Sequence, residues 1–278
     1  MADRKITQQQ IKAFAEYLFR EEKSEATREK YLRDVKAFAE FTAGQSISRE
    51  LVRAWKETLQ ERYAVRSVNA MLAAVNSFLL FLGWPDCRVK NLRLQRRSYC
   101  PEERELTRGE YLRLLKAAEG KPQLQLLLQT ICATGIRVSE LQHFTVGAVC
   151  RGEIRVSCKN KTRIIMIPGK LKKLLLRFAK QKQIMNGPIF LGRQGTPLNR
   201  SSIWRQMKAL CKMAGVSEGK VFPHNLRKLF ARSFYALDKD IAQLADILGH
   251  SSIDTTRIYI MTTGSEHRRK IERLGLVM

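Results

Sequence analysis

Long apolar runs and acidic residues are both scarce in this sequence. Strongly apolar stretches such as Phe78 to Leu82 are short against the roughly 20 residues of a transmembrane helix. The N-terminus, MADRKITQQQ, lacks the apolar core of a signal peptide. We therefore expect a cytoplasmic protein without a membrane partner.

Cysteine and histidine are sparse and scattered. The six cysteines form no CxxC pair, and the four histidines are not spaced like the ligands of a zinc site. Thiols in a chain that is not exported stay reduced, so we expect no disulfide framework. The sequence thus predicts neither a metal nor another cofactor.

Basic residues greatly outnumber acidic ones: there are 51 Lys and Arg against 26 Asp and Glu, a formal net charge of +25. Positions 1–100 hold 19 basic and 12 acidic residues, and the remainder of the chain holds 32 and 14. A basic surface spread over both halves indicates a polyanionic partner. Double-stranded DNA and RNA both fit, and charge alone does not separate them.

The first 85 residues predict a helical domain. A length of 278 residues allows two ordinary domains, and a hydrophobic fraction of 44% suffices for buried cores. Apolar residues recur at helical spacing in four segments, which start at Thr7, at Thr27, near Leu51 and in the most apolar stretch after it. Gly83 and Pro85 end the fourth segment. Four short helices with brief connections form a small bundle.

Residues 86–103 separate this bundle from the rest of the chain and show no clear period. Two interpretations stand side by side: a solvated linker, or an extended connection that lies along a phosphate backbone. The basic side chains concerned are Arg88, Lys90, Arg93, Arg96 and Arg97.

Residues 104–278 predict a mostly helical domain with a small antiparallel β-sheet. Thr107 and Glu110 fit a capping box before a helical pattern. Alternating apolar residues over 154–158, a polar turn and a return over 164–167 predict a β-hairpin. Helical patterns cover 123–133, 171–182, 202–213, 225–237, 241–248 and 255–261.

Four segments of this second domain contain candidate functional residues. They are ATGIRVSEL at 133–141, the hairpin tip at Lys159, HNLR at 224–227 and LGHSSIDTTRIY at 248–259. Taken singly, each residue has an ordinary structural explanation: Arg137 in a surface ion pair, His224 at a helix start, Tyr259 in a core.

Together and in this order, the segments resemble the tyrosine recombinases, also called the phage integrase family, over nearly the whole chain. The resemblance implies an N-terminal SAM-like domain that clamps DNA (1–85) and a C-terminal catalytic domain (104–278). It implies site-specific cutting and rejoining of duplex DNA through a covalent 3′-phosphotyrosyl intermediate, without metal or ATP. The family's catalytic positions fall on Arg137, Lys159, His224, Arg227, His250 and Tyr259, with Glu140 in support.

These residue types agree with that chemistry. A phosphodiester under attack gains negative charge, which Arg137 and Arg227 would stabilise with permanently ionised, bidentate groups. Tyr259 would be the nucleophile, and His224 would accept its proton because a phenol has a pKa near 10. His250 would hydrogen-bond the phosphate.

The catalytic lysine is assigned from the hairpin tip, which reads Cys158-Lys159-Asn160-Lys161 where the family commonly has Gly-Lys-Gly. Lys159 would protonate the leaving 5′ oxygen as a general acid. Arg163 lies four residues after it, as the family's hairpin arginine does, and this favours Lys159 over Lys161. Lys161 and Arg163 are then expected to contact phosphate or to be solvated charges.

The resemblance also implies how chains assemble. In related recombinases a C-terminal tail passes to the adjacent subunit of a tetramer on DNA, and we expect the residues after Tyr259 to do the same. Packing of the tail on its own domain is the alternative. Accessory proteins are a further class of partner to test for.

Rival functions remain open. A type IB topoisomerase shares the nucleophile and the arginines, but the compact N-terminal domain and the HNLR and LGHSS strings favour a recombinase. A DNA-binding protein without catalysis would not need all six catalytic positions filled. For the biological role we expect integration and excision of a mobile element, with resolution of chromosome or plasmid multimers by a Xer-type enzyme as the alternative.

Overall fold

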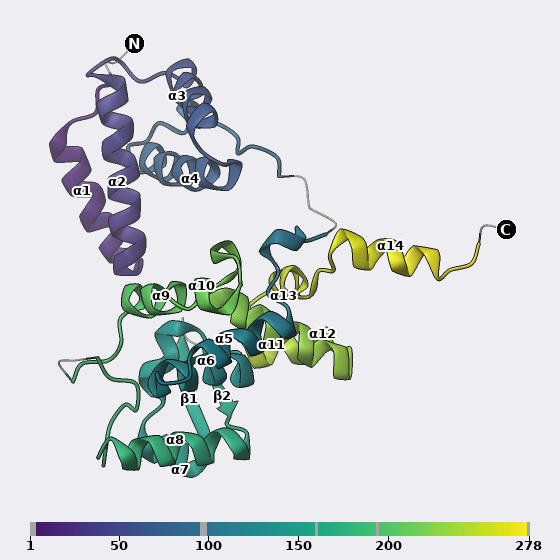
Figure 1. Cartoon of the computed structure of the whole chain (residues 1–278). Coiled ribbons are helices and arrows are strands. Elements are labelled where there is room, and N and C mark those ends of the chain that lie inside the picture. Colours follow the sequence, from purple (N-terminus) through teal and green to yellow (C-terminus); the bar gives the residue numbers. More distant parts are fainter. Residues whose placement is uncertain (1–3, 95–98, 159–160, 193–194, 277–278) are drawn as a thin grey trace. The chain divides into compact units, whose positions relative to one another are not determined.

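A computed structural model gives the structure of the chain and describes residues 4–94, 99–158, 161–192 and 195–276 (Figure 1). The chain divides into two compact units, Met1–Arg96 and Arg97–Met278. Both are mainly helical, as expected. Over the described residues, no helix is long and apolar enough to span a bilayer.

The first unit is a four-helix bundle, formed by α1 (Gln8–Arg20), α2 (Glu25–Thr42), α3 (Arg49–Arg62) and α4 (Val65–Phe81). The predicted capping box is present, because Thr7 and Gln10 each accept the other's backbone N–H through their side chains. The second helix was predicted to start at Thr27, but it starts at Glu25, after Ser24 as N-cap residue. The core between the helices is apolar, with Phe14, Phe38 and Phe78 among its fully buried side chains.

The segment that follows α4 stays on this unit. Cys87 and Val89 are buried in its core. The backbone N–H groups of Val89 and Leu92 donate to the side-chain oxygens of Asn76 and Asn69, at 3.1 and 2.8 Å. Residues 87–92 are therefore fixed to the helices of the first unit.

The second unit contains ten further α-helices among its described residues and one hairpin. The helices are α5 (Arg108–Ala117), α6 (Pro122–Thr134), α7 (Val146–Arg151), α8 (Gly169–Gln181), α9 (Arg200–Lys208), α10 (Cys211–Ala214), α11 (Pro223–Asp238), α12 (Ile241–Leu248) and α13 (Ile253–Ile260), and α14 (Gly264–Glu272) follows them as the tail. α11 packs against α6, α12 and α13, and so lies at the centre of the unit (Figure 1). This helix and its neighbours position the candidate site.

The predicted hairpin is present as β1 (Glu153–Cys158) and β2 (Lys161–Met166), paired antiparallel. Ile154, Val156 and Ile165 are buried, so one face of the ribbon packs into the core. β1 contacts α7 and β2 contacts α12. The hairpin thus brings Arg163 of β2 next to α12.

One predicted helix, 202–213, is divided into α9 and α10 by a turn at Ala209 and Leu210. Apolar side chains continue across that turn at helical spacing, which is why the pattern indicated a single helix. The short α7 was not predicted. Its six residues are too few for a periodic signal, although Thr145 caps it and Gly152 ends it in a left-handed conformation.

Candidate active site

Arg227 of α11 is a buried arginine at the centre of the site, with 2% of its surface exposed. Its guanidinium donates to the carbonyl oxygens of Gly135 and Leu248, and Nη2 lies 3.2 Å from Nε2 of His250. Burial, and then the positive charge of Arg137, lower its pKa to about 10. Arg227 therefore remains ionised at neutral pH and is held rigidly.

Two glycines allow backbone to approach this arginine cluster. Gly135 and Gly249 end α6 and α12 with φ angles of +61° and +62°, a region that other residues rarely adopt. A Cβ at Gly135 would collide with the ring of Phe230, and one at Gly249 would lie 2.7 Å from Cδ of Arg163. The glycines of the ATG and LGH strings are thus required by conformation and by space.

Glu140 offsets part of the positive charge. This buried carboxylate accepts from Arg137 Nη1 at 3.0 Å, from the Arg137 backbone N–H at 2.7 Å and from Arg163 Nη2 at 2.5 Å. Both arginines also donate to the end of α12, Arg163 to the Ile247 carbonyl at 2.7 Å and Arg137 to the Gly249 carbonyl at 2.9 Å. The result is a preorganised group of guanidiniums around one carboxylate.

Tyr259 of α13 faces two histidines. Its hydroxyl lies 3.2 Å from Nδ1 of His224, and its ring centroid is 4.8 Å from the rings of both His224 and His250. Thr256 fixes His250, whose Nδ1 lies 2.9 Å from the threonine hydroxyl. The guanidinium carbon of Arg227 is 5.9 Å from the centroid of the tyrosine ring. A phenol, two imidazoles and a guanidinium thus converge.

Both histidines are kept neutral by their surroundings. Burial, and then the charge of Lys228, lower the pKa of His224 below its ordinary value. Burial and the neighbouring arginines lower the pKa of His250 to about 4. At neutral pH an uncharged His224 is therefore available to accept the proton of Tyr259.

Most of the predicted catalytic set is brought together here: Arg137, His224, Arg227, His250 and Tyr259, with Glu140 in support. Lys159 lies outside the described residues, as do Arg96 and Arg97. Lys161 is the first residue of β2. Arg88, Lys90 and Arg93 are exposed on the first unit.

Sequence reasoning missed part of the site. Thr256 was not singled out, although it lies six residues after His250 in the same LGHSSIDTTRIY string. Arg163 was expected at a phosphate or in solvent, yet its side chain is 12% exposed and pairs with Glu140. No local pattern distinguishes a buried arginine from an exposed one, because its partners come from distant segments.

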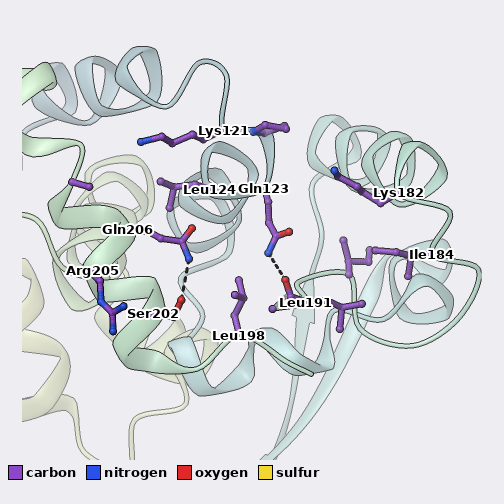
Figure 2. Close-up of a pocket in the computed structure, with 14 residues that line it drawn as sticks. Lys121, Gln123, Leu124, Lys182, Ile184, Leu191, Leu198, Ser202, Arg205 and Gln206 are labelled. Carbon is purple, nitrogen blue, oxygen red and sulfur yellow. Dashed lines mark hydrogen bonds between the residues drawn. The ribbon is translucent and has the colours of Figure 1, made fainter. Parts of the chain in front are cut away.

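A separate cavity of about 890 Å³ lies elsewhere in the second unit (Figure 2). Its lining includes Lys121, Gln123, Lys182, Leu198 and Arg205. Gln123 Nε2 donates to the Leu191 carbonyl at 2.7 Å, which ties α6 to the loop before α9. Arg137, His224, Arg227, His250 and Tyr259, the candidate catalytic residues that the structure describes, do not line this cavity.

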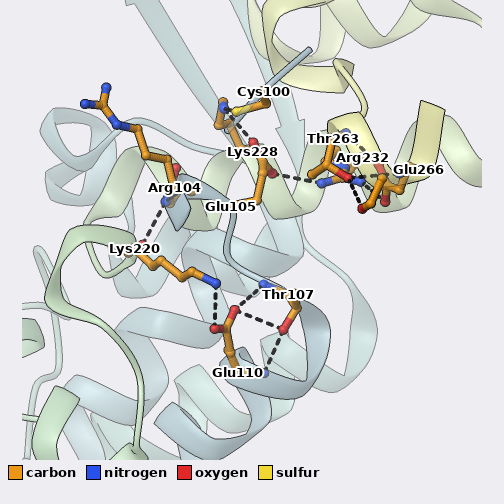
Figure 3. Close-up of polar contacts among 12 residues, drawn as sticks. Cys100, Arg104, Glu105, Thr107, Glu110, Lys220, Lys228, Arg232, Thr263 and Glu266 are labelled. Atoms are coloured by element: carbon orange, nitrogen blue, oxygen red, sulfur yellow. Dashed lines mark hydrogen bonds and ion pairs between the residues drawn. The ribbon is translucent and has the colours of Figure 1, made fainter. Parts of the chain in front are cut away.

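The start of the tail contacts its own unit (Figure 3). The Cys100 backbone N–H donates to the Thr262 carbonyl at 3.0 Å, and Arg232 Nη2 pairs with Glu266 Oε1 at 2.5 Å. Beyond these contacts, apolar side chains of the tail are exposed, with values of 54% for Ile271 and 62% for Leu274. The beginning of the tail is thus bound to its own unit, and apolar side chains towards its end are exposed.

Two family models match the chain. The phage integrase family matches residues 104–266, and the N-terminal SAM-like domain of phage integrases matches residues 11–85. One match thus lies in each unit.

Named relatives agree with these models over nearly the full length. The tyrosine recombinase XerC of Roseiflexus castenholzii is 30% identical over 280 positions, covering 90% of this chain and 88% of the relative. The tyrosine recombinase XerA of Pyrococcus furiosus is 26% identical, covering 100% of this chain and 98% of the relative.

A solved structure supports the fold. A lambda integrase (75–356) dimer bound to a COC′ core site superposes with a TM-score of 0.74 at 20% identity, covering 93% of this chain and 96% of that chain. At that identity the likeness concerns the fold alone. With the family models and the relatives, it leads to one conclusion: the chain belongs to the phage integrase family, the tyrosine recombinases.

Proposed function

We propose that this protein is a site-specific DNA strand-transferase that cuts and rejoins duplex DNA with Tyr259 as nucleophile. One observation carries the proposal: the hydroxyl of Tyr259 lies 3.2 Å from the ring of His224, beside the buried guanidinium of Arg227. A nucleophile within hydrogen-bond distance of an uncharged base, next to fixed positive charge, is the arrangement that phosphoryl transfer requires.

The reaction balances with the groups of this site. The oxygen of Tyr259 attacks phosphorus and its proton passes to Nδ1 of His224. The bond from phosphorus to the 5′ oxygen breaks, and that oxygen takes a proton from a general acid, for which we propose Lys159. A 3′-phosphotyrosyl ester and a 5′-hydroxyl result, and attack by a 5′-hydroxyl reverses the steps without ATP.

Arg137 and Arg227 would have different roles in the reaction, because their exposure to solvent differs. The Arg137 side chain is 35% exposed, which supports a direct contact with a non-bridging phosphate oxygen, whereas Arg227 is almost fully buried. Arg227 would act without a direct contact to the phosphate, through its positive charge and through its contact with His250. Donors fixed in advance cost no reorganisation during the reaction, and the loss of one typically costs about 10²–10³ in rate.

The first unit would bind the duplex through phosphate contacts. Arg88, Lys90 and Arg93 are exposed on it, in a segment that hydrogen bonds and buried side chains fix in place. Cations in fixed positions are better suited to contact a regular phosphate backbone than cations on a flexible linker. We propose the same role for Arg96 and Arg97, and for Lys161 on the hairpin.

Assembly through the tail is a further part of the proposal. Ile271, Leu274 and Leu276 are 54–84% exposed, and apolar side chains of this kind are suited to a groove on an adjacent copy. The expected product is a tetramer on DNA. A chain truncated after Gly264 should bind a single site normally but fail to form the tetrameric complex in sedimentation experiments.

Two biological roles fit this chemistry in the cytoplasm. We expect integration and excision of a mobile element, while the similarity to XerA and XerC favours the alternative, multimer resolution. The position of the cut decides between them. Sites at the two ends of a movable segment support the first role, and a single chromosomal or plasmid site supports the second.

A suicide substrate tests the proposal directly. Binding sites are first selected from a pool of random duplexes, and each is then nicked near its centre so that the cleaved end diffuses away. We expect a covalent adduct whose modified peptide contains Tyr259, formed equally in the presence of a metal chelator. Tyr259→Phe should form none, whereas the matched control Tyr235→Phe should react normally. Nicking without an adduct would overturn the proposal.

A further inference from the structure

Glu105 is a buried carboxylate between two cations. The residue is 4% exposed. Its Oε1 accepts from Lys228 Nζ at 2.8 Å, and its Oε2 accepts from Arg232 Nη1 at 2.9 Å (Figure 3). The Lys228 ammonium, whose side chain is 11% exposed, also lies 3.5 Å from the sulfur of Cys100. Buried charges of this kind are costly unless paired, so the pairs differ from solvated surface contacts.

Both cations are on α11, on the same face as the proton acceptor. His224, Lys228 and Arg232 follow one another at intervals of four residues, which places neighbours about one turn apart on a helix. Lys228 also directly follows Arg227. The charge of Lys228 is the largest cause, after burial, of the lowered pKa of His224. The Glu105 carboxylate thus neutralises a cation that acts on the candidate base.

The same carboxylate is linked to the start of the tail. Arg232 bridges Glu105 and Glu266, and Glu266 forms the capping box of α14 with Thr263. A chain of ion pairs therefore joins Glu105 to two elements, which are the face of α11 and the tail.

We propose that Glu105 is a positioning residue: it fixes and neutralises Lys228, and so sets how readily His224 takes up a proton. The other groups that face His224 are Tyr259 on α13, His250 before it, Arg227 on α11 and Arg200 on α9. The role of this effect in DNA cleavage rests on the proposed function. The effect of Glu105 on proton uptake by His224 does not.

Proton uptake by His224 is measurable without DNA. The ring C–H signal of His224 is followed by NMR against pH in the full chain and assigned by its loss in His224→Gln. Glu105→Gln leaves Lys228 uncompensated and should move the midpoint to lower pH, by on the order of half a pH unit. Lys228→Gln should move it to higher pH by a similar amount, and the double variant should return close to the original.

A matched control separates electrostatics from a general disturbance. Glu110 pairs with Lys220 at 2.9 Å in the same unit, also with little exposure, and glutamine there can keep the capping box (Figure 3). Glu110→Gln should leave the His224 midpoint unmoved. Shifts in the same direction for Glu105→Gln and Lys228→Gln, or no shift in either, would overturn the proposal. If the midpoints shift as expected while the wild type forms no DNA adduct, the proposed function fails instead.

Discussion

The two units of this protein have different interiors. Among the described residues, the first unit buries only Asp34 and Thr42 as polar or charged side chains. The second unit buries charges at two places, Glu140 with Arg227 and Glu105 with its cations. The first interior is a core of packed aromatic and aliphatic side chains.

The difference follows from what each unit has to do. An apolar core stabilises a bundle at no electrostatic cost, and cations for DNA can then remain outside in water. A site that stabilises developing phosphate charge needs guanidiniums that are already desolvated and fixed, and their burial costs free energy. In the second unit, the carboxylate of Glu140 and the carbonyl oxygens at helix ends offset that cost, because they accept hydrogen bonds from the guanidiniums.

The largest expected effect concerns the proposed nucleophile, Tyr259, which belongs to the second unit. Tyr259→Phe keeps the buried ring but removes the attacking oxygen, so adduct formation should fall by at least about 10⁴-fold. DNA affinity should change little, since binding depends on phosphate contacts. Adduct yield on a suicide substrate and a binding isotherm measure the two separately. A parallel loss of affinity would contradict the division of labour.

The next effect tests the interiors themselves. Glu140→Gln leaves Arg137 and Arg163 near Arg227 without their carboxylate, and should destabilise the second unit by about 3 kcal/mol. Asp34→Asn in the first unit should cost about 1 kcal/mol or less, because its partner Lys30 is 37% exposed and can be solvated.

Hydrogen exchange with mass spectrometry follows each unit separately in these two variants. Protection should fall in α6 and α12 for Glu140→Gln and hardly at all in α2 and α4 for Asp34→Asn. Equal losses in the two units would show that buried charge is no more important in the second than in the first.

A smaller effect is expected from the exposed cations of the first unit. Exchanging Arg88, Lys90 and Arg93 together for glutamine should weaken DNA binding about tenfold near physiological salt. It should also reduce the slope of log affinity against log salt by roughly three. Fluorescence anisotropy over a fourfold range of salt measures both quantities, and the adduct yield at saturating DNA should be unaffected.

The matched control exchanges three other exposed cations of the same unit, Lys12, Arg20 and Lys23. The net charge falls by the same amount, so a non-specific effect would be equal in both variants. A markedly smaller change in slope for the control supports contact by the segment after α4. An identical change in the two variants would show that the segment after α4 does not contact DNA.

The last expected effect is the dependence on pH. The pKa of His224 is lowered below its ordinary value, so the proposed base stays neutral at neutral pH and cleavage should be level from pH 8 down to about 7. Below the lowered pKa the rate should fall by up to about tenfold per pH unit, as the base becomes protonated. Initial rates of adduct formation between pH 5 and 8 test this, and a fall that begins above pH 7 would exclude His224 as the base.

Stability has to be followed in the same experiment. Unfolded His250 takes up a proton near pH 6.5, whereas in the fold its pKa is about 4, so the second unit loses stability as pH falls between these values. Circular dichroism at each pH separates this loss of fold from the protonation of His224.

Local patterns anticipated much of the structure where a few neighbouring residues decide it. The capping boxes at Thr7 and Thr107 and the alternation of the hairpin satisfy backbone groups within a few positions, and all three are present. The start of α2 was predicted two residues late, because Thr27 was taken as the start where Ser24 is the N-cap residue. Such boundaries are decided by small energy differences between adjacent residues.

The order of residue types along the chain was sufficient to identify the family and its candidate catalytic set, since chemistry restricts which side chains can carry it. The tertiary structure alone decided that Arg163 turns inward to Glu140, that Thr256 fixes His250, and that Glu105 connects α11 with the tail. Each of these contacts joins segments that only folding brings together. Burial and charge pairing depend on everything that surrounds a side chain, and a linear pattern records only its neighbours in sequence.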